Sequence, residues 1–164
     1  MRHDVIISGH YINTLRAQYG RETQSAAIRE LVDNSVDANA TSITITFNSS
    51  LDEIVIEDNG DGCSDVGMFF NIGSSDKVGE GKVGRYGIGG TWACLFLSDK
   101  EYVVTNSRSS GLHSSAKMDW SSVAEHGRKF QWEGHQPRPM FADENPGTKI
   151  TLCGIRRGNT ESRG

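Results

Sequence analysis

Three polar residues share one flank of a predicted helix and have the side chains that phosphate chemistry needs. Glu30, Asn34 and Asp37 stand at i, i+4 and i+7, so a helix over residues 23–39 places them on the same side. An amide oxygen suits Mg²⁺, and a carboxylate beside it can orient or deprotonate water. A solvated helix face gives the same pattern, so this flank alone is weak evidence for a site.

A second polar cluster directly follows the apolar run at residues 53–57. It reads Asp58-Asn59-Gly60-Asp61-Gly62. Asn-Gly and Asp-Gly are common in turns that end strands, and that is the alternative interpretation. A carboxylate only accepts hydrogen bonds, so Asp58 at the strand exit suits an exocyclic amine such as adenine N6.

A third cluster is rich in glycine and opens a predicted helix at residues 88–97. Ten of the chain's 19 glycines fall between residues 60 and 90. The glycines follow the spacing G-x-x-G-x-G. The segment lacks the lysine of a Walker loop, and its spacing differs from that of a dinucleotide-binding fingerprint. At a helix start it offers backbone N–H donors to phosphate. The cluster consists of Gly84, Arg85, Tyr86, Gly87, Ile88, Gly89 and Gly90, followed by Thr91.

The elements that position these clusters are predicted from periodicity. Apolar residues at a 3.6-residue period predict the helix at 23–39, with Ser35 on its apolar side. Alternating runs predict a hairpin over 42–48 and 53–57, a strand or arm at 3–8 and strands at 101–105, 112–118 and 148–153. A short helix at 13–19 and a weaker strand at 128–132 complete the prediction. This order favours an α+β fold, a two-layer sandwich with helices on one face of a mixed, mostly antiparallel sheet.

Composition narrows the class of protein. Seventeen Lys+Arg against 21 Asp+Glu give a net charge of −4, which supplies no electrostatic footprint for nucleic acid. No apolar run is long enough to cross a membrane. The three cysteines are widely spaced, so they suggest neither a disulfide framework nor a zinc site. These features predict a reduced, cytoplasmic, single-domain protein, with residues 1–154 as the domain and 155–164 as a polar tail leading towards a linker.

The order and spacing of the clusters resemble the GHKL ATPase superfamily, which includes the gyrase B subunit, the heat-shock chaperones, the histidine kinases and MutL. RELVDNSVDA looks like its N box, VIEDNGDGC like its first glycine box and GRYGIGG like its second. PGTKI is similar to its last box. The four boxes occur in order across roughly residues 22–153. The resemblance implies the Bergerat fold, with a glycine-rich lid over ATP.

The resemblance also implies roles for the nucleotide-binding residues. Asp58 would accept from adenine N6 with support from Thr148, Asn34 would coordinate Mg²⁺, and Gly84–Gly90 would hold the β- and γ-phosphates. Residues 64–83 would form the lid, where Lys77 is the candidate phosphate contact and Lys82 the runner-up. Cys63 would line the adenine pocket. The remaining residues implied to surround ATP are Asp37, Ala38, Gly60, Gly62 and Thr91.

Glu30 separates the branches of the superfamily. Hydrolysing members use a glutamate at the head of the N box as general base, whereas histidine kinases lack this acid–Asn–Asp-Ala arrangement. The resemblance therefore implies an ATPase. A histidine kinase catalytic domain and an ATP-gated interaction module with little turnover are the alternatives.

The resemblance further implies partners for the domain. Gyrase-like and MutL-like members complete the site with a lysine from a following domain, and only ten residues follow Gly154 here. We therefore expect slow activity in isolation, an ATP-dependent homodimer in which residues 1–10 exchange, and a partner domain that responds to ATP. By eye, the lid is closest to MORC-like, MutL-like and heat-shock-chaperone-like members.

Overall fold

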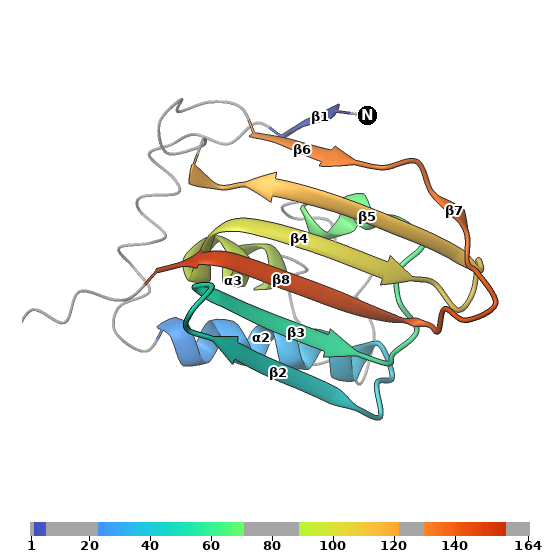
Figure 1. Cartoon of the computed structure of the whole chain (residues 1–164), viewed down its shortest axis with the longest axis horizontal. Coiled ribbons are helices and arrows are strands. Elements are labelled where there is room, and N and C mark those ends of the chain that lie inside the picture. The colour runs from blue at the N-terminus through green and yellow to red at the C-terminus, as the bar shows by residue number, and fades with distance from the viewer. Residues whose placement is uncertain (1, 6–22, 71–88, 122–129, 157–164) are drawn as a thin grey trace, which may run out of the picture.

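A computed structural model describes residues 2–5, 23–70, 89–121 and 130–156. Its elements keep the labels of Figure 1. The helices are α2 (Thr23–Asp37), the short 3-10 helix η1 (Val66–Phe69) and α3 (Gly89–Leu97). The strands are β1 (Arg2–Val5), β2 (Ile43–Asn48), β3 (Glu53–Asp58), β4 (Ser98–Asn106), β5 (Leu112–Asp119), β6 (Phe130–Gly134), β7 (Arg138–Pro139) and β8 (Gly147–Ile155).

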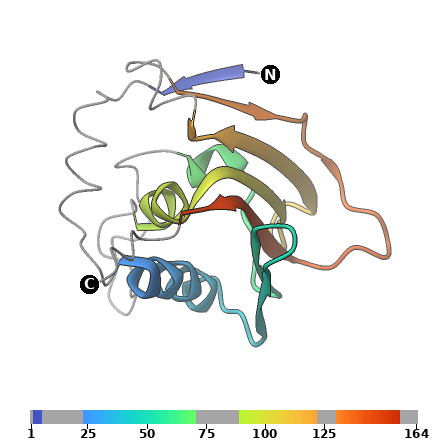
Figure 2. The same cartoon turned by 60° about the vertical axis from the view of Figure 1, so that its left-hand side comes forward.

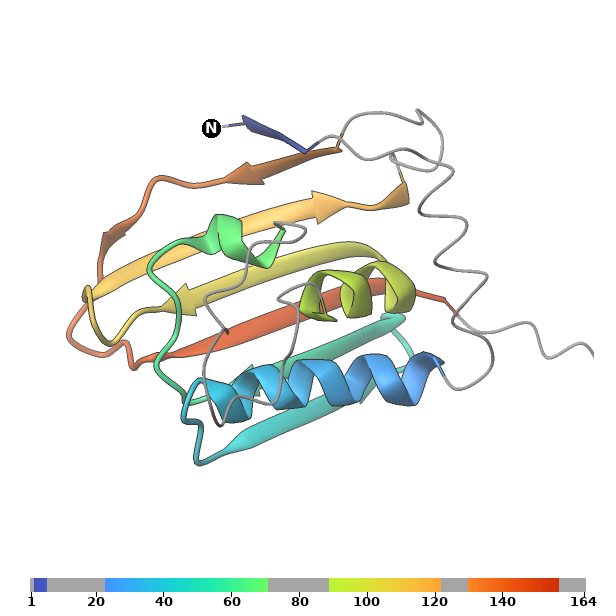
Figure 3. The same cartoon turned by 180° about the vertical axis from the view of Figure 1, so that it is seen from behind.

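The strands form one sheet in the order β1-β6-β5-β4-β8-β3-β2, and β7 pairs with the end of β5. Every pairing in the described part of the chain is antiparallel. One face of the sheet is open in Figure 1, while η1, α2 and α3 cover the other face, as Figure 3 shows. The expected α+β sandwich with its helices on one face is confirmed, but the described sheet is wholly antiparallel and not mixed, because no described pair of neighbouring strands runs parallel.

The core lies between the sheet and these helices. Buried residues alternate with more exposed ones at 54 and 56 of β3, at 101, 103 and 105 of β4, and at 150 and 152 of β8, which is the pattern of strands covered on one face. α2 turns Ala27 and Leu31 into this core. Figure 2 shows α2 and α3 side by side on the same face of the sheet. α3 is apolar almost all round because it lies between α2 and the sheet.

One carboxyl group occupies a core position. Glu101 of β4 is 1% exposed and lies opposite buried Leu152. Trp120 Nε1 donates a hydrogen bond to Glu101 Oε2 over 3.1 Å, while Oε1 has no hydrogen-bond partner within the described ranges. Burial raises the pKa of Glu101 to about 8, so the side chain is mostly protonated at neutral pH.

The predicted helix at 23–39, the hairpin, the helix at 88–97 and the later strands all appear, with ends shifted by a few residues. The helix expected at 13–19 lies outside the described residues. η1 was not predicted: Val66 and Phe70, expected in the lid, pack into the core, where Phe70 stacks on Trp132 at 5.3 Å. β8 continues to Ile155, one residue into the expected tail. No helix in the described ranges is long and apolar enough to span a membrane.

Candidate functional site

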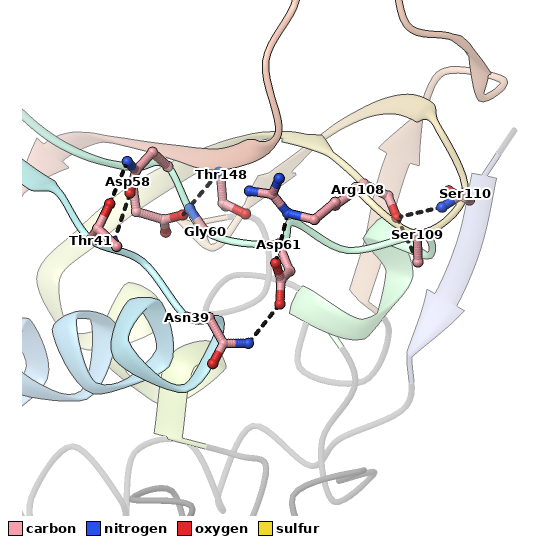
Figure 4. Close-up of polar contacts among 11 residues, drawn as sticks. Asn39, Thr41, Asp58, Gly60, Asp61, Arg108, Ser109, Ser110 and Thr148 are labelled. Atoms are coloured by element: carbon pink, nitrogen blue, oxygen red, sulfur yellow. Dashed lines mark hydrogen bonds and ion pairs between the residues drawn. The ribbon is translucent and has the colours of Figure 1, made fainter.

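The best-defined polar cluster surrounds Asp58, the last residue of β3 (Figure 4). Ser35 Oγ donates to Asp58 Oδ2 at 2.7 Å. The backbone N–H groups of Gly60 and Thr148 donate to Oδ1 at 2.9 and 3.2 Å. A helix, a turn and a neighbouring strand therefore each supply one donor to the same carboxylate. Because a carboxylate has about four acceptor positions, one position remains for a further donor.

The strand register explains how Thr148 reaches this carboxylate. Thr148 lies opposite Asp58 on one side and Thr105 on the other. The Thr105 and Thr148 hydroxyl oxygens are 3.2 Å apart, and Cys63 N–H donates to Thr105 Oγ1 over 2.8 Å. A row of hydroxyl groups therefore links β4 and β8 to the segment after β3, and it places half-buried Cys63 beside the cluster.

The glycines after Asp58 allow this segment to pass close to its neighbours. A Cβ on Gly60 would lie 2.6 Å from the Ala38 carbonyl oxygen. Gly62 has a φ of +66°, and a Cβ there would lie 2.0 Å from the Asn106 carbonyl oxygen. A side chain at Gly60 would therefore clash severely. A side chain at Gly62 would clash as well, and the backbone there has a conformation that glycine tolerates best. Close packing therefore requires glycine at both positions, in addition to the general preference of turns for glycine.

Asp61, between these glycines, ties the end of α2 to the turn after β4. Its carboxylate accepts from Asn39 Nδ2 at 2.6 Å and pairs with Arg108 Nε at 2.9 Å (Figure 4). Its backbone N–H donates to the Ala38 oxygen, and its own carbonyl accepts from the Arg108 N–H. The hydrogen bonds from Asn39 and then Arg108 lower the pKa of Asp61. Nothing in the sequence pattern had indicated this junction.

The flank of α2 faces the start of α3. Asn34 is half-buried, and its Nδ2 lies 2.6 Å from the position that a Cβ of Gly90 would take. Asp37 is half-buried and Glu30 is exposed on the same helix. Of this predicted flank, Asn34 therefore lies beside the N-terminus of α3, where backbone N–H groups and the helix dipole favour anions.

Thr91, in the first turn of α3, is buried and donates its hydroxyl hydrogen to the Phe69 carbonyl at 2.7 Å. This bond holds α3 against η1. The predicted phosphate-binding residues before Gly89 lie outside the described residues: Lys77, Lys82, Gly84, Arg85, Tyr86, Gly87 and Ile88.

Sequence reasoning missed two members of the Asp58 cluster, Ser35 and Thr105. Ser35 is 4% exposed and Thr105 is fully buried. A signal existed for Ser35, because a serine on the apolar side of a helix needs a partner when it is buried. Its partner, Asp58, lies 23 residues away in the sequence. The helical pattern could therefore indicate that Ser35 needs a hydrogen-bond partner, but not which residue provides it.

The described side chains include no group of three or more His, Cys, Asp or Glu that could hold a metal ion. This is compatible with a magnesium–nucleotide site, because Mg²⁺ retains several waters and is bound through one or two protein oxygens together with substrate phosphates. The half-buried Asn34 amide, at the N-terminus of α3, has the chemistry required of such a ligand.

The model of one protein family, described as "Histidine kinase-, DNA gyrase B-, and HSP90-like ATPase", matches residues 22–143. The match includes the α2 flank, Asp58 with the turn that follows it, and α3, and it ends before Thr148. The chain belongs to this family. The expected membership of the GHKL superfamily is confirmed, and membership implies an ATP-binding domain.

Individual relatives agree with the family. The DNA mismatch repair protein MutL of Crocosphaera subtropica (strain ATCC 51142 / BH68) is 36% identical over 59 residues, which are 36% of this chain and 11% of that protein. The ATPase and transducer domains of DNA topoisomerase II from Balamuthia mandrillaris align with a TM-score of 0.62 at 18% identity. This alignment covers 79% of this chain and 36% of that one.

The ATPase region of Saccharomyces cerevisiae topoisomerase II aligns with a TM-score of 0.59 at 16% identity, over 78% of this chain and 37% of that one. At these identities the two topoisomerase structures show a shared fold. The chain spans little more than a third of each of them and about a tenth of the MutL protein.

Proposed function

We propose that this domain binds Mg²⁺·ATP between α2, α3 and the end of β3, and hydrolyses it to ADP and phosphate. The Asp58 cluster carries the proposal. Three donors from three elements fix this carboxylate and leave one acceptor position. Adenine presents an amino group to such an acceptor. Guanine presents a carbonyl oxygen at the equivalent atom, which a carboxylate repels. We therefore expect ATP to be preferred over GTP.

The N-terminus of α3 lies beside Asn34 and would receive the phosphates, with Gly84–Gly90 supplying N–H donors. Bound Mg²⁺ would offset phosphate charge, and Asn34 is its proposed protein ligand. Asp37, Ala38, Gly60, Gly62, Cys63 and Thr91 line or support the nucleotide in this proposal, and Thr148 supports the base. Lys77 is the proposed lysine contact to phosphate.

Glu30 is the proposed general base. It is exposed on α2, one helical turn before Asn34, so it can reach a water at the phosphate end. The water proton passes to the Glu30 carboxylate while the water oxygen attacks the γ-phosphorus. The bond from that phosphorus to the bridging oxygen breaks, and ADP leaves. A positioned base of this kind contributes about 10²–10⁴-fold.

Family membership also motivates the wider proposal. ATP binding would close the segment between η1 and α3 as a lid, favour a homodimer, and transmit that change to a further domain. Residues 1–154 would form the ATPase domain and the residues after them would begin a linker. An ATP-gated module with little turnover remains the second candidate, because Glu30 is exposed and no hydrogen bond or ion pair within the described ranges fixes it for catalysis.

Calorimetric titration of the whole chain with ATP and with GTP, each with Mg²⁺, tests the proposed base recognition. Asp58→Asn replaces one acceptor oxygen by an NH₂ donor, so the ATP preference should disappear and the ATP affinity should fall about 10–100-fold. Asp143→Asn, on an exposed loop, is the matched control and should bind as the wild type does. Equal binding of ATP and GTP by the wild type would contradict the assignment of Asp58.

A further inference from the structure

The two outer strands of the described sheet differ in their content of charged residues. Among the described strands, β1 lies at one margin and its sequence carries Arg2, His3 and Asp4, whereas β2 lies at the other margin (Figure 1). Residues 38–51, which include all of β2, contain no charged residue and no proline. Exposed edge strands are normally protected from further pairing by lysine, proline or a bulge. The β2 sequence lacks the first two, and its register against β3 is continuous.

The ladder shows which backbone groups face outwards from β2. Asn59 N–H donates to the Ser42 carbonyl, so Ser42 and Asn59 form a hydrogen-bonded pair between the two chain segments. Hydrogen-bonded and outward-facing residues alternate along an antiparallel strand. The N–H and C=O groups of Ile43, Ile45 and Phe47 therefore point away from β3, towards the free edge.

The side chains of these same three residues lie on the helix-covered face, because their partners Ile54 and Ile56 are buried. Phe47 is nevertheless 66% exposed, and Leu51 in the adjoining turn is 65% exposed. Two of the five exposed large apolar side chains of the described structure, Phe47 and Leu51, thus lie on β2 and its adjoining turn.

We propose that the β2 edge pairs with the β2 edge of a second copy of this chain, antiparallel and without nucleotide. A two-fold axis through Ile45 sets Ile45 opposite itself and Ile43 opposite Phe47 of the other copy. All three outward-facing residues then pair, and each pair exchanges two hydrogen bonds. The exposed Phe47 ring packs across the new ladder against a β-branched residue.

The open face supports the same register. There Thr44 lies opposite Thr46 of the second copy, and cross-strand threonine pairs are favourable. In this register a charge at residue 45 would face the same charge, and a charge elsewhere on β2 would lie on the same short ladder as its own copy. The uncharged run from 38 to 51 avoids this repulsion, and its lack of charge favours a second copy over a charged strand.

Two double variants test this pairing with the whole chain in the absence of nucleotide. Thr44→Lys/Thr46→Lys and Thr44→Glu/Thr46→Glu change only exposed side chains. Analytical ultracentrifugation of the wild type over a concentration series should show a mass rising from 18.0 kDa towards twice that value. Each variant should stay at the lower mass, because like charges then face each other across the axis. An equimolar mixture of the two should regain the doubled mass.

Gln136→Lys, a charge added at an exposed residue between β6 and β7, should dimerise like the wild type. Circular dichroism and the unfolding temperature check that each variant is folded. A wild type that stays monomeric without nucleotide would overturn the proposal. So would a lysine variant that dimerises as the wild type does, or a Lys and Glu mixture that remains monomeric.

Discussion

Asp58 and Glu101 are two acidic side chains on the same sheet, and their surroundings are opposite. Asp58 ends a strand and accepts hydrogen bonds from α2, the following turn and β8. Glu101 lies inside the core with Trp120 as its hydrogen-bond donor, and burial raises its pKa to about 8. Asp58, the proposed ligand-binding carboxylate, is surrounded by donors at the end of a strand, while the core carboxyl group is neutralised by a proton. This difference supports the proposal that the polar site lies at the end of β3.

The largest expected effect concerns the core carboxyl group. Between pH 4.5 and about 8 the unfolded chain has released the Glu101 proton while the folded chain retains it. The free energy of unfolding should therefore fall as pH rises through this window, by up to about 1.4 kcal/mol per pH unit. Glu101→Gln cannot ionise and should flatten that dependence. Urea unfolding at several pH values measures it.

Glu133→Gln, an exposed carboxyl paired with Lys117, is the control and should leave the slope nearly unchanged. If Glu101→Gln and the wild type kept the same slope, Glu101 would not be the protonated core group.

A smaller loss is expected at the turn that supports Asp58. Gly62→Ala places a methyl group against the Asn106 carbonyl and should lower the free energy of unfolding by about 2–4 kcal/mol. Gly111→Ala is a matched control, because Gly111 has the same φ of +66° and nothing within 4 Å of its Cβ position. It should cost only the backbone strain, about 1 kcal/mol. Equal losses would show that close packing at Gly62 contributes nothing.

The smallest effect tests one donor of the cluster. Ser35→Ala removes the hydroxyl that donates to Asp58 Oδ2 and should weaken ATP binding by about 1 kcal/mol, roughly 3–10-fold. Ser98→Ala removes another buried serine hydroxyl, which donates to the Cys94 carbonyl outside the cluster. It should change stability without changing ATP affinity. Equal ATP affinity in both variants would show that the Ser35 hydroxyl does not support ATP binding through Asp58.

Local periodicity predicted the elements that carry the site. The α2 helix and the β2–β3 hairpin follow from spacing within one segment, and so does the polar flank of Glu30, Asn34 and Asp37. Contacts between distant segments were not predictable. Arg108 meets Asp61 across 47 residues and Thr148 meets Asp58 across 90.

η1 was missed for a related reason. Val66 and Phe70 stand among glycines, and their burial depends on Trp132 and the sheet. No local period indicates a four-residue 3-10 helix.

We propose that the domain binds ATP and that Glu30 drives its hydrolysis. Mg²⁺·ATP binding and phosphate release, measured together for the wild type and for Glu30→Ala, test both parts at once. We expect equal binding by both proteins, with release reduced about 10²–10⁴-fold in the variant. Unchanged release in Glu30→Ala would contradict the catalytic assignment, and failure of the wild type to bind ATP would contradict the site itself.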